Sequence, residues 1–115
     1  MMHATKPGDV IRLVVTTCPD ERVGEAIVRA LVEERLAACG NIVPGVRSIY
    51  RWQGMVEADA ECLVLLKTRT ERLDAMAQRL YELHPYDIPE LLSLRVDRGA
   101  AAYLDWVVEE TKGGS

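Results

Sequence analysis

The sequence predicts one α+β domain in which two helices cover one face of an antiparallel sheet. The chain has 115 residues, close to the commonest size of a single domain. Strand-like and helical segments follow one another in the order β, α, β, β, α, β, and a last helix closes the chain. This order is the split βαβ, or ferredoxin-like, open-faced sandwich. We expect a single domain over residues 1–115, with a flexible arm at 1–9 and a flexible tail at 112–115.

The first half of the chain is predicted as a strand, a helix and a strand. Residues 10–17 are nearly continuously apolar and β-favouring. From residue 19 to about residue 38 the apolar positions keep the i, i+3, i+4 spacing of a helix, and Gly40 is the expected terminator. Residues 42–52 are again strand-like, and the Pro-Gly pair at 44–45 indicates a bulge near the start of that strand.

The second half begins as the return strand of a long hairpin. The pair at 53–54 is a short turn signal, and the apolar run 62–66 follows it. Thr68 and Glu71 stand three residues apart ahead of a helical stripe, which is the spacing of a capping box. The remaining expected elements are a helix over 70–83 that stops at His84-Pro85, a strand over 91–96 and a closing helix over 100–111.

The apolar run 62–66 also predicts self-association. Alternate residues of a strand point to opposite faces of its sheet, so this run places apolar side chains on both faces. In an open-faced sandwich the helices cover one face only, and a second subunit would cover the other. The alternative is that the last helix and the loop around Tyr86 hide this strand within one chain.

Composition and motifs exclude several classes of function. A net charge of −4 and a pI near 5.2 disfavour nucleic-acid binding. No window approaches the roughly 20 apolar residues of a membrane span. The three cysteines lack CxxC spacing and are expected to be reduced, buried thiols. Together with the missing membrane span, this predicts a cytoplasmic protein without a membrane partner. The absence of GxSxG, HExxH, Walker A and GxGxxG sequences predicts no enzymatic activity and no catalytic residue.

The segment 84–90 concentrates side chains that can bind or catalyse, and its two prolines stiffen it. His84 is a candidate metal ligand, although a histidine at the end of a helix often only complements the helix dipole. Tyr86 and Glu90 are candidate ligand or interface residues. Asp87 and Glu90, with His84, form a possible acid and base set for a hydrolase, which is the less favoured alternative.

The strand over 42–52 carries a second group of candidates. Tyr50 and Trp52 share one face, and Arg47 and Arg51 share the other. Tyrosine and tryptophan combine a large apolar body with a polar tip, and arginine pairs with carboxylates, so all four suit a ligand site or an interface. Cross-strand packing and surface ion pairing are the alternative. Cys39, ahead of this strand, is a possible thiolate ligand or a core residue.

Six segments are characteristic, namely TTCPD at 16–20, LAACGNIVPG at 36–45, SIYRW at 48–52, LKT at 66–68, HPYDIPELL at 84–92 and YLDW at 103–106. Taken together, these segments resemble the CutA family of divalent-cation tolerance proteins over nearly the whole chain. The resemblance implies a ferredoxin-like protomer in a PII-like homotrimer that responds to divalent cations, with Cu²⁺ or another divalent cation as ligand. Of the copper-ligand positions described for some members, this chain has Thr16, Leu83 and His84, so only His84 matches, while Cys39 matches a family cysteine.

The sequence therefore predicts a homotrimeric divalent-cation, or copper, response protein. A metal ion or a small molecule would bind in clefts between subunits, near His84, Cys39, Tyr50 and Trp52. The alternatives are a trimer that anchors other proteins and, with less support, a hydrolase.

Overall fold

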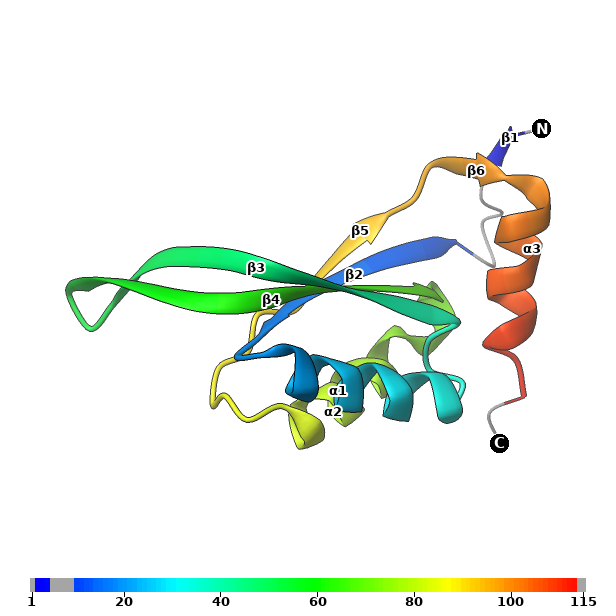
Figure 1. Cartoon of the computed structure of the whole chain (residues 1–115). Coiled ribbons are helices and arrows are strands. Elements are labelled where there is room, and N and C mark those ends of the chain that lie inside the picture. The colour runs from blue at the N-terminus through cyan, green and yellow to red at the C-terminus, as the bar shows by residue number, and fades with distance from the viewer. Residues whose placement is uncertain (1, 5–9, 114–115) are drawn as a thin grey trace.

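The computed structural model describes residues 2–4 and 10–113. Its elements are β1 (Met2–Ala4), β2 (Ile11–Cys18), α1 (Glu21–Glu33), β3 (Cys39–Trp52), β4 (Met55–Arg69), a 3₁₀ turn (Thr70–Arg72), α2 (Leu73–Leu83), β5 (Leu92–Arg95), β6 (Arg98–Ala100) and α3 (Ala101–Glu110). The main sheet is antiparallel, in the order β3-β4-β2-β5. Helices α1 and α2 lie on one face of this sheet, and α3 stands at its end (Figure 1). The predicted ferredoxin-like α+β class is confirmed.

Helix α1 is shorter than the sequence pattern predicts. It begins after Asp20, whose carboxylate accepts the backbone N–H of Val23 at 2.9 Å, so the predicted start at residue 19 is two residues early. The predicted end near residue 38 is wrong. Arg35 takes a left-handed backbone conformation, with φ of 59°, and the apolar residues after it leave the helix to join the core.

Gly40 lies inside β3, so its predicted role as the terminator of the first helix is wrong. Strand β3 begins at Cys39, three residues before the predicted start. A Cβ atom at position 40 would lie 2.8 Å from both Leu66 Cδ2 and Val28 Cγ1. Glycine at this position therefore lets α1 pack closely against the sheet.

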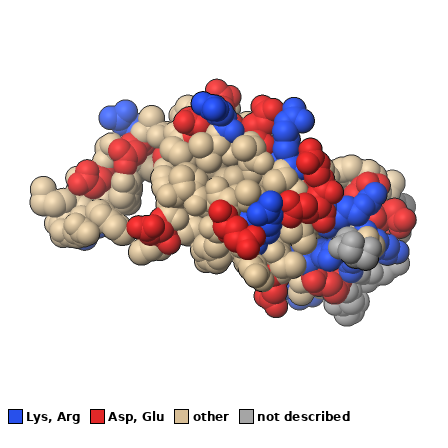
Figure 2. Space-filling model, turned by 90° about the horizontal axis from the view of Figure 1, so that it is seen from below, with Lys and Arg blue, Asp and Glu red and all other residues tan. Residues whose placement is uncertain are grey.

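Strands β3 and β4 form a long hairpin that projects from the body of the molecule (Figures 1 and 2). The register shifts between Val43 and Val46, which confirms the predicted bulge. Gln53 and Gly54 both have positive φ, 50° and 81°, as a two-residue type I′ turn requires. Residues 46–61 extend beyond the end of β2, and we call them the arm.

Helix α2 does not begin with the predicted capping box. The Thr68 hydroxyl donates to the Leu36 carbonyl at 2.8 Å, and the Glu71 carboxylate accepts from Arg69, so neither side chain caps the helix. Tertiary contacts claim both groups, and a 3₁₀ turn leads into the helix instead. The predicted stop at His84 is confirmed, because its backbone is extended ahead of the proline.

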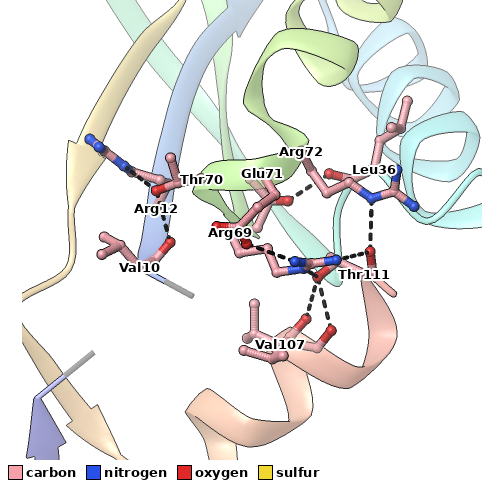
Figure 3. Close-up of polar contacts among 11 residues, drawn as sticks. Val10, Arg12, Leu36, Arg69, Thr70, Glu71, Arg72, Val107 and Thr111 are labelled. Atoms are coloured by element: carbon pink, nitrogen blue, oxygen red, sulfur yellow. Dashed lines mark hydrogen bonds and ion pairs between the residues drawn. The ribbon is translucent and has the colours of Figure 1, made fainter. Parts of the chain in front are cut away.

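Hydrogen bonds join the end of α3 to the last residue of β4 and to the 3₁₀ turn (Figure 3). Arg69 Nε donates to Thr111 Oγ1 at 3.0 Å, and Arg72 Nε donates to the Thr111 carbonyl at 2.8 Å. Both guanidinium groups lie at the negative end of the α3 dipole. The helix covers one end of the sheet and closes a second small core made of Ile11, Ala38, Leu104 and Val107.

The sheet face turned away from α1 and α2 remains largely apolar. Leu13 pairs with Leu94, and Val15 pairs with both Leu65 and Leu92, so these side chains share one face. Leu92 and Leu94 are 56% and 49% exposed. Helix α3 covers only one end of this face. The alternative in which the last helix hides the apolar strand therefore holds for that end alone. We call this face the open face; its apolar residues are Leu13, Val15, Leu63, Leu65, Leu92 and Leu94, and Thr17 and Lys67 share it.

Strand β1 lies at the end of the molecule where α3 stands (Figure 1). Residues 2–4 of the predicted flexible arm form β1, which pairs antiparallel with β6. Residues 1 and 5–9 of that prediction, and residues 114–115 of the predicted tail, lie outside the described residues. Within 2–4 and 10–113, no helix is long and apolar enough to cross a membrane.

Candidate functional site

A cavity of about 600 Å³ lies where the loop 86–90 meets the base of the arm. Its walls combine aromatic and acidic side chains. Figure 2 shows acidic side chains on both sides of the notch between the arm and the body. Thr17, which pairs with Leu63 of the open face, also lines the cavity, so the two features adjoin. The aromatic and acidic lining residues are Tyr50, Trp52, Tyr86, Asp59, Glu61, Asp87 and Glu90.

Two tyrosine hydroxyls hold two of these carboxylates. Tyr50 donates to Asp59 Oδ2, and Tyr86 donates to Glu61 Oε2 at 2.7 Å. The hydrogen bond to Asp59 raises the pKa of Tyr50 to about 12. Burial, followed by the hydrogen bond to Glu61, raises the pKa of Tyr86 above its usual range. Both phenols therefore remain protonated donors at neutral pH.

His84 is buried beside the cavity, with both ring nitrogens paired. Nε2 lies 2.8 Å from the Thr17 carbonyl, and Nδ1 lies 3.1 Å from the backbone N of Tyr86. A carbonyl only accepts and a backbone N–H only donates, so Nε2 carries the proton and Nδ1 is the acceptor. The imidazole thereby ties the loop 86–90 to the end of β2. A metal ion at His84 would have to displace one of these partners.

The predicted metal ligands His84 and Cys39 do not meet in one chain. Cys39 pairs with Lys67, whereas Cys18, 3.9 Å from His84 Nε2, pairs with Cys62. Five residues along β4 separate these pairs, roughly 17 Å at strand spacing. The Cys39 thiol instead lies 3.3 Å from the Tyr103 hydroxyl. Across the described residues, no three His, Cys, Asp or Glu side chains converge in a way that could hold a metal ion.

The other predicted site residues divide between the cavity and the opposite face of the arm. Tyr50, Trp52, Tyr86 and Glu90 all line the cavity, so the structure brings them together from β3 and the loop 86–90. Arg47 and Arg51 are exposed and do not line it. The Arg51 guanidinium donates to the Gly54 carbonyl at the turn. Asp87 and Glu90 line the cavity without His84, so the three groups of the hydrolase alternative are not assembled there.

The sequence did not single out Asp59 and Glu61, which the structure places in the cavity wall. The signal was present, because Glu57, Asp59 and Glu61 alternate with alanines and so share one face of a strand. What the sequence could not show is that the loop 86–90 lies opposite them.

Two cysteines are packed together next to His84. Cys18 and Cys62 are paired across β2 and β4, and both are buried, as predicted, while Cys39 is half-buried. The Cys62 thiol donates to the Asp20 carbonyl at 3.1 Å. Burial, followed by the proximity of Cys62, raises the pKa of Cys18 from 9.0 to about 12. These thiols remain protonated and serve as core side chains at neutral pH.

Alkaline pH is expected to destabilise the fold through Cys18. Its folded pKa lies above its unfolded value of 9.0, so its contribution to stability is complete below pH 9 and is lost as the pH rises toward 12. Between about pH 9 and 10.5, this group accounts for at most about 2 kcal/mol of lost stability. Chemical denaturation should show a steeper loss for the unaltered chain than for Cys18→Ala over that range. Equal slopes would contradict the prediction.

The fold and the cavity together define a class, a ferredoxin-like, PII-like α+β protein with a projecting hairpin and a ligand-sized cavity at its base. The chain belongs to the family described as "CutA1 divalent ion tolerance protein", whose sequence pattern matches residues 12–110. The resemblance seen in the sequence segments is thereby confirmed.

Individual relatives agree with this assignment. "Divalent-cation tolerance protein CutA" of Thermus thermophilus is 52% identical over 99 residues, 86% of this chain and 96% of that protein. Mouse "Protein CutA" is 42% identical over 95% of this chain, which spans 61% of the mouse protein. Both names place the chain among CutA proteins.

Solved structures share the fold over nearly the full length. The divalent cation tolerance protein of Thermus thermophilus superposes with a TM-score of 0.86 at 50% identity, covering 88% of this chain and 98% of that one. CutA of Synechococcus elongatus gives a TM-score of 0.90 at 37% identity, covering 97% and 96%. Neither the family description nor the name of the Thermus relative mentions an enzymatic reaction.

Proposed function

We propose that the chain forms a homotrimer that responds to divalent cations and binds a metal ion or a small molecule in clefts between its subunits. One observation carries the proposal, the open face with its half-exposed Leu92 and Leu94. A monomer would leave this apolar surface in water, and burial in a subunit contact removes it. The cavity adjoins the open face at Thr17, so assembly would place the cavity beside a neighbouring subunit.

Assembly is tested by light scattering coupled to size-exclusion chromatography. The expected mass is three times the chain mass of 12.8 kDa, and it should not change with concentration in the micromolar range. A monomer throughout that range would refute the trimer.

The metal component of the proposal concerns Cu²⁺ or another divalent cation. Within one chain His84 and Cys39 do not share a site, so a metal site would have to combine groups from neighbouring subunits. This proposal predicts that copper binds only to the assembled form. A cytoplasmic location stays part of the proposal. Relatives named chloroplastic or periplasmic show that CutA proteins occur in more than one compartment.

Native mass spectrometry at micromolar Cu(II) measures this binding. We expect a stoichiometric adduct on the trimer that weakens at least about tenfold in His84→Ala, because imidazole is a good ligand for copper. Cys39→Ala reports whether the thiol contributes. The trimer peak in the same spectrum shows whether each variant still assembles. No stoichiometric adduct, or equal adducts in the unaltered chain and both variants, would contradict metal binding at these residues.

A further inference from the structure

The cavity at the base of the arm is lined by acidic and aromatic side chains. We propose that it binds an organic cation with a flat apolar body, such as an arylamidine or a substituted guanidine. This inference rests on the proposed ligand-binding function and names the class of small molecule. A cavity of about 600 Å³ is within the usual size range of small-molecule sites.

Negative charge in this cavity has no counterion in the described part of the chain. Asp59, Glu61, Asp87 and Glu90 line it, and no Lys or Arg lines it. The ion pairs formed by the described residues do not involve these four carboxylates. A cationic ligand would supply the missing positive charge, whereas an anion would meet four like charges.

The tyrosine hydrogen bonds orient two of the carboxylates toward a ligand. Asp59 uses Oδ2 for the Tyr50 hydroxyl, and Glu61 uses Oε2 for the Tyr86 hydroxyl. Each carboxylate keeps its second oxygen as an acceptor for an N–H group. Amidinium and guanidinium groups present two parallel N–H donors, which suits oxygens that are already held in place.

Aromatic walls complete the selectivity for an organic cation. Tyr50, Trp52 and Tyr86 are all partly exposed and line the cavity. The faces of such rings attract cations and stack on flat apolar groups. A bare divalent metal ion would gain little from them.

The carboxylates are also poorly arranged for a metal ion. A hard divalent cation needs several oxygens at one point, at bonding distances near 2.0–2.6 Å. Among residues 2–4 and 10–113, no three acidic, histidine or cysteine side chains converge in this way. The acidic groups are instead divided between β4, which carries Asp59 and Glu61, and the loop 86–90, an arrangement that suits an extended molecule.

Benzamidinium and benzamide test the charge requirement, because they share a shape and differ by one positive charge. Benzoate serves as the anionic probe. In a ligand-observed NMR titration of the full chain near neutral pH, we expect benzamidinium to bind at least about tenfold more tightly than benzamide, and benzoate not to bind.

Isosteric variants place the binding in this cavity. Glu61→Gln and Asp59→Asn remove one charge each while keeping an oxygen for the tyrosine hydroxyl, and each should weaken benzamidinium about tenfold. Glu33→Gln, on the exposed side of α1, makes the same change of net charge away from the cavity and should stay within about twofold. Circular dichroism confirms that each variant is folded.

Several results would overturn the proposal. These are equal binding of benzamidinium and benzamide, no benzamidinium binding, or affinities unchanged in both cavity variants. Displacement of benzamidinium by stoichiometric Cu(II) in a manner lost in Glu61→Gln would also overturn it, in favour of a metal site. Light scattering on the same samples separates the two proposals: a trimer without binding refutes only this inference, and a monomer that binds refutes only the assembly.

Discussion

Leu65→Glu is expected to convert the proposed trimer into a folded monomer. Leu65 lies on the open face, pairs with Val15, and is only partly buried within one chain, so a single chain can solvate the new carboxylate. In the proposed subunit contact the same carboxylate would lose its hydration on burial, a cost of several kcal/mol per subunit. Light scattering should show a fall from three times the chain mass to the chain mass at micromolar concentration.

A matched substitution separates assembly from folding. Val32→Glu adds the same charge on α1, at a side chain that is 36% exposed on the helical side of the molecule. This variant should remain a trimer. The circular dichroism spectrum of Leu65→Glu should match that of the unaltered chain. A Leu65→Glu trimer of unchanged stability would refute the proposed use of the open face.

Leu66→Ala is expected to lower the free energy of unfolding by about 3–5 kcal/mol. This neighbour of Leu65 points to the opposite face, has no exposed surface, and belongs to the main core between the sheet and the helices. Truncation would leave a cavity next to Gly40, which has no side chain to fill it. The loss is a large part of the roughly 5–15 kcal/mol that stabilises a typical domain.

Chemical denaturation measures this loss, with both proteins at the same chain concentration because unfolding of an assembly depends on concentration. Met55→Ala, at the tip of the arm and 65% exposed, is the control and should change stability by less than about 0.5 kcal/mol. A loss below about 1 kcal/mol for Leu66→Ala would contradict close packing of this side chain in the core.

Leu65 and Leu66 show what the sequence alone predicts. Period-two alternation in the run 62–66 predicted two apolar faces. The register of β2, β4 and β5, with the burial of their side chains, shows that one face is buried under the helices and the other is partly exposed. Local chemistry was equally informative at the turn 53–54 and at His84, where positive φ values and a following proline act over one or two residues.

Sequence by itself determined the order of the main elements, the fold class and the family, because periodicity and short motifs report on local backbone preferences. It missed the short strands β1 and β6, which pair with each other across nearly the whole chain. Only the tertiary structure decided the end of α1, the role of Gly40 and the partner of Thr68, since each depends on a contact with a distant segment. The cavity is another such case. Tyr86 and Glu61 are 25 residues apart, and only folding brings the phenol to the carboxylate. Long-range contacts of this kind leave no periodic signal, and they determine which residues form the candidate site.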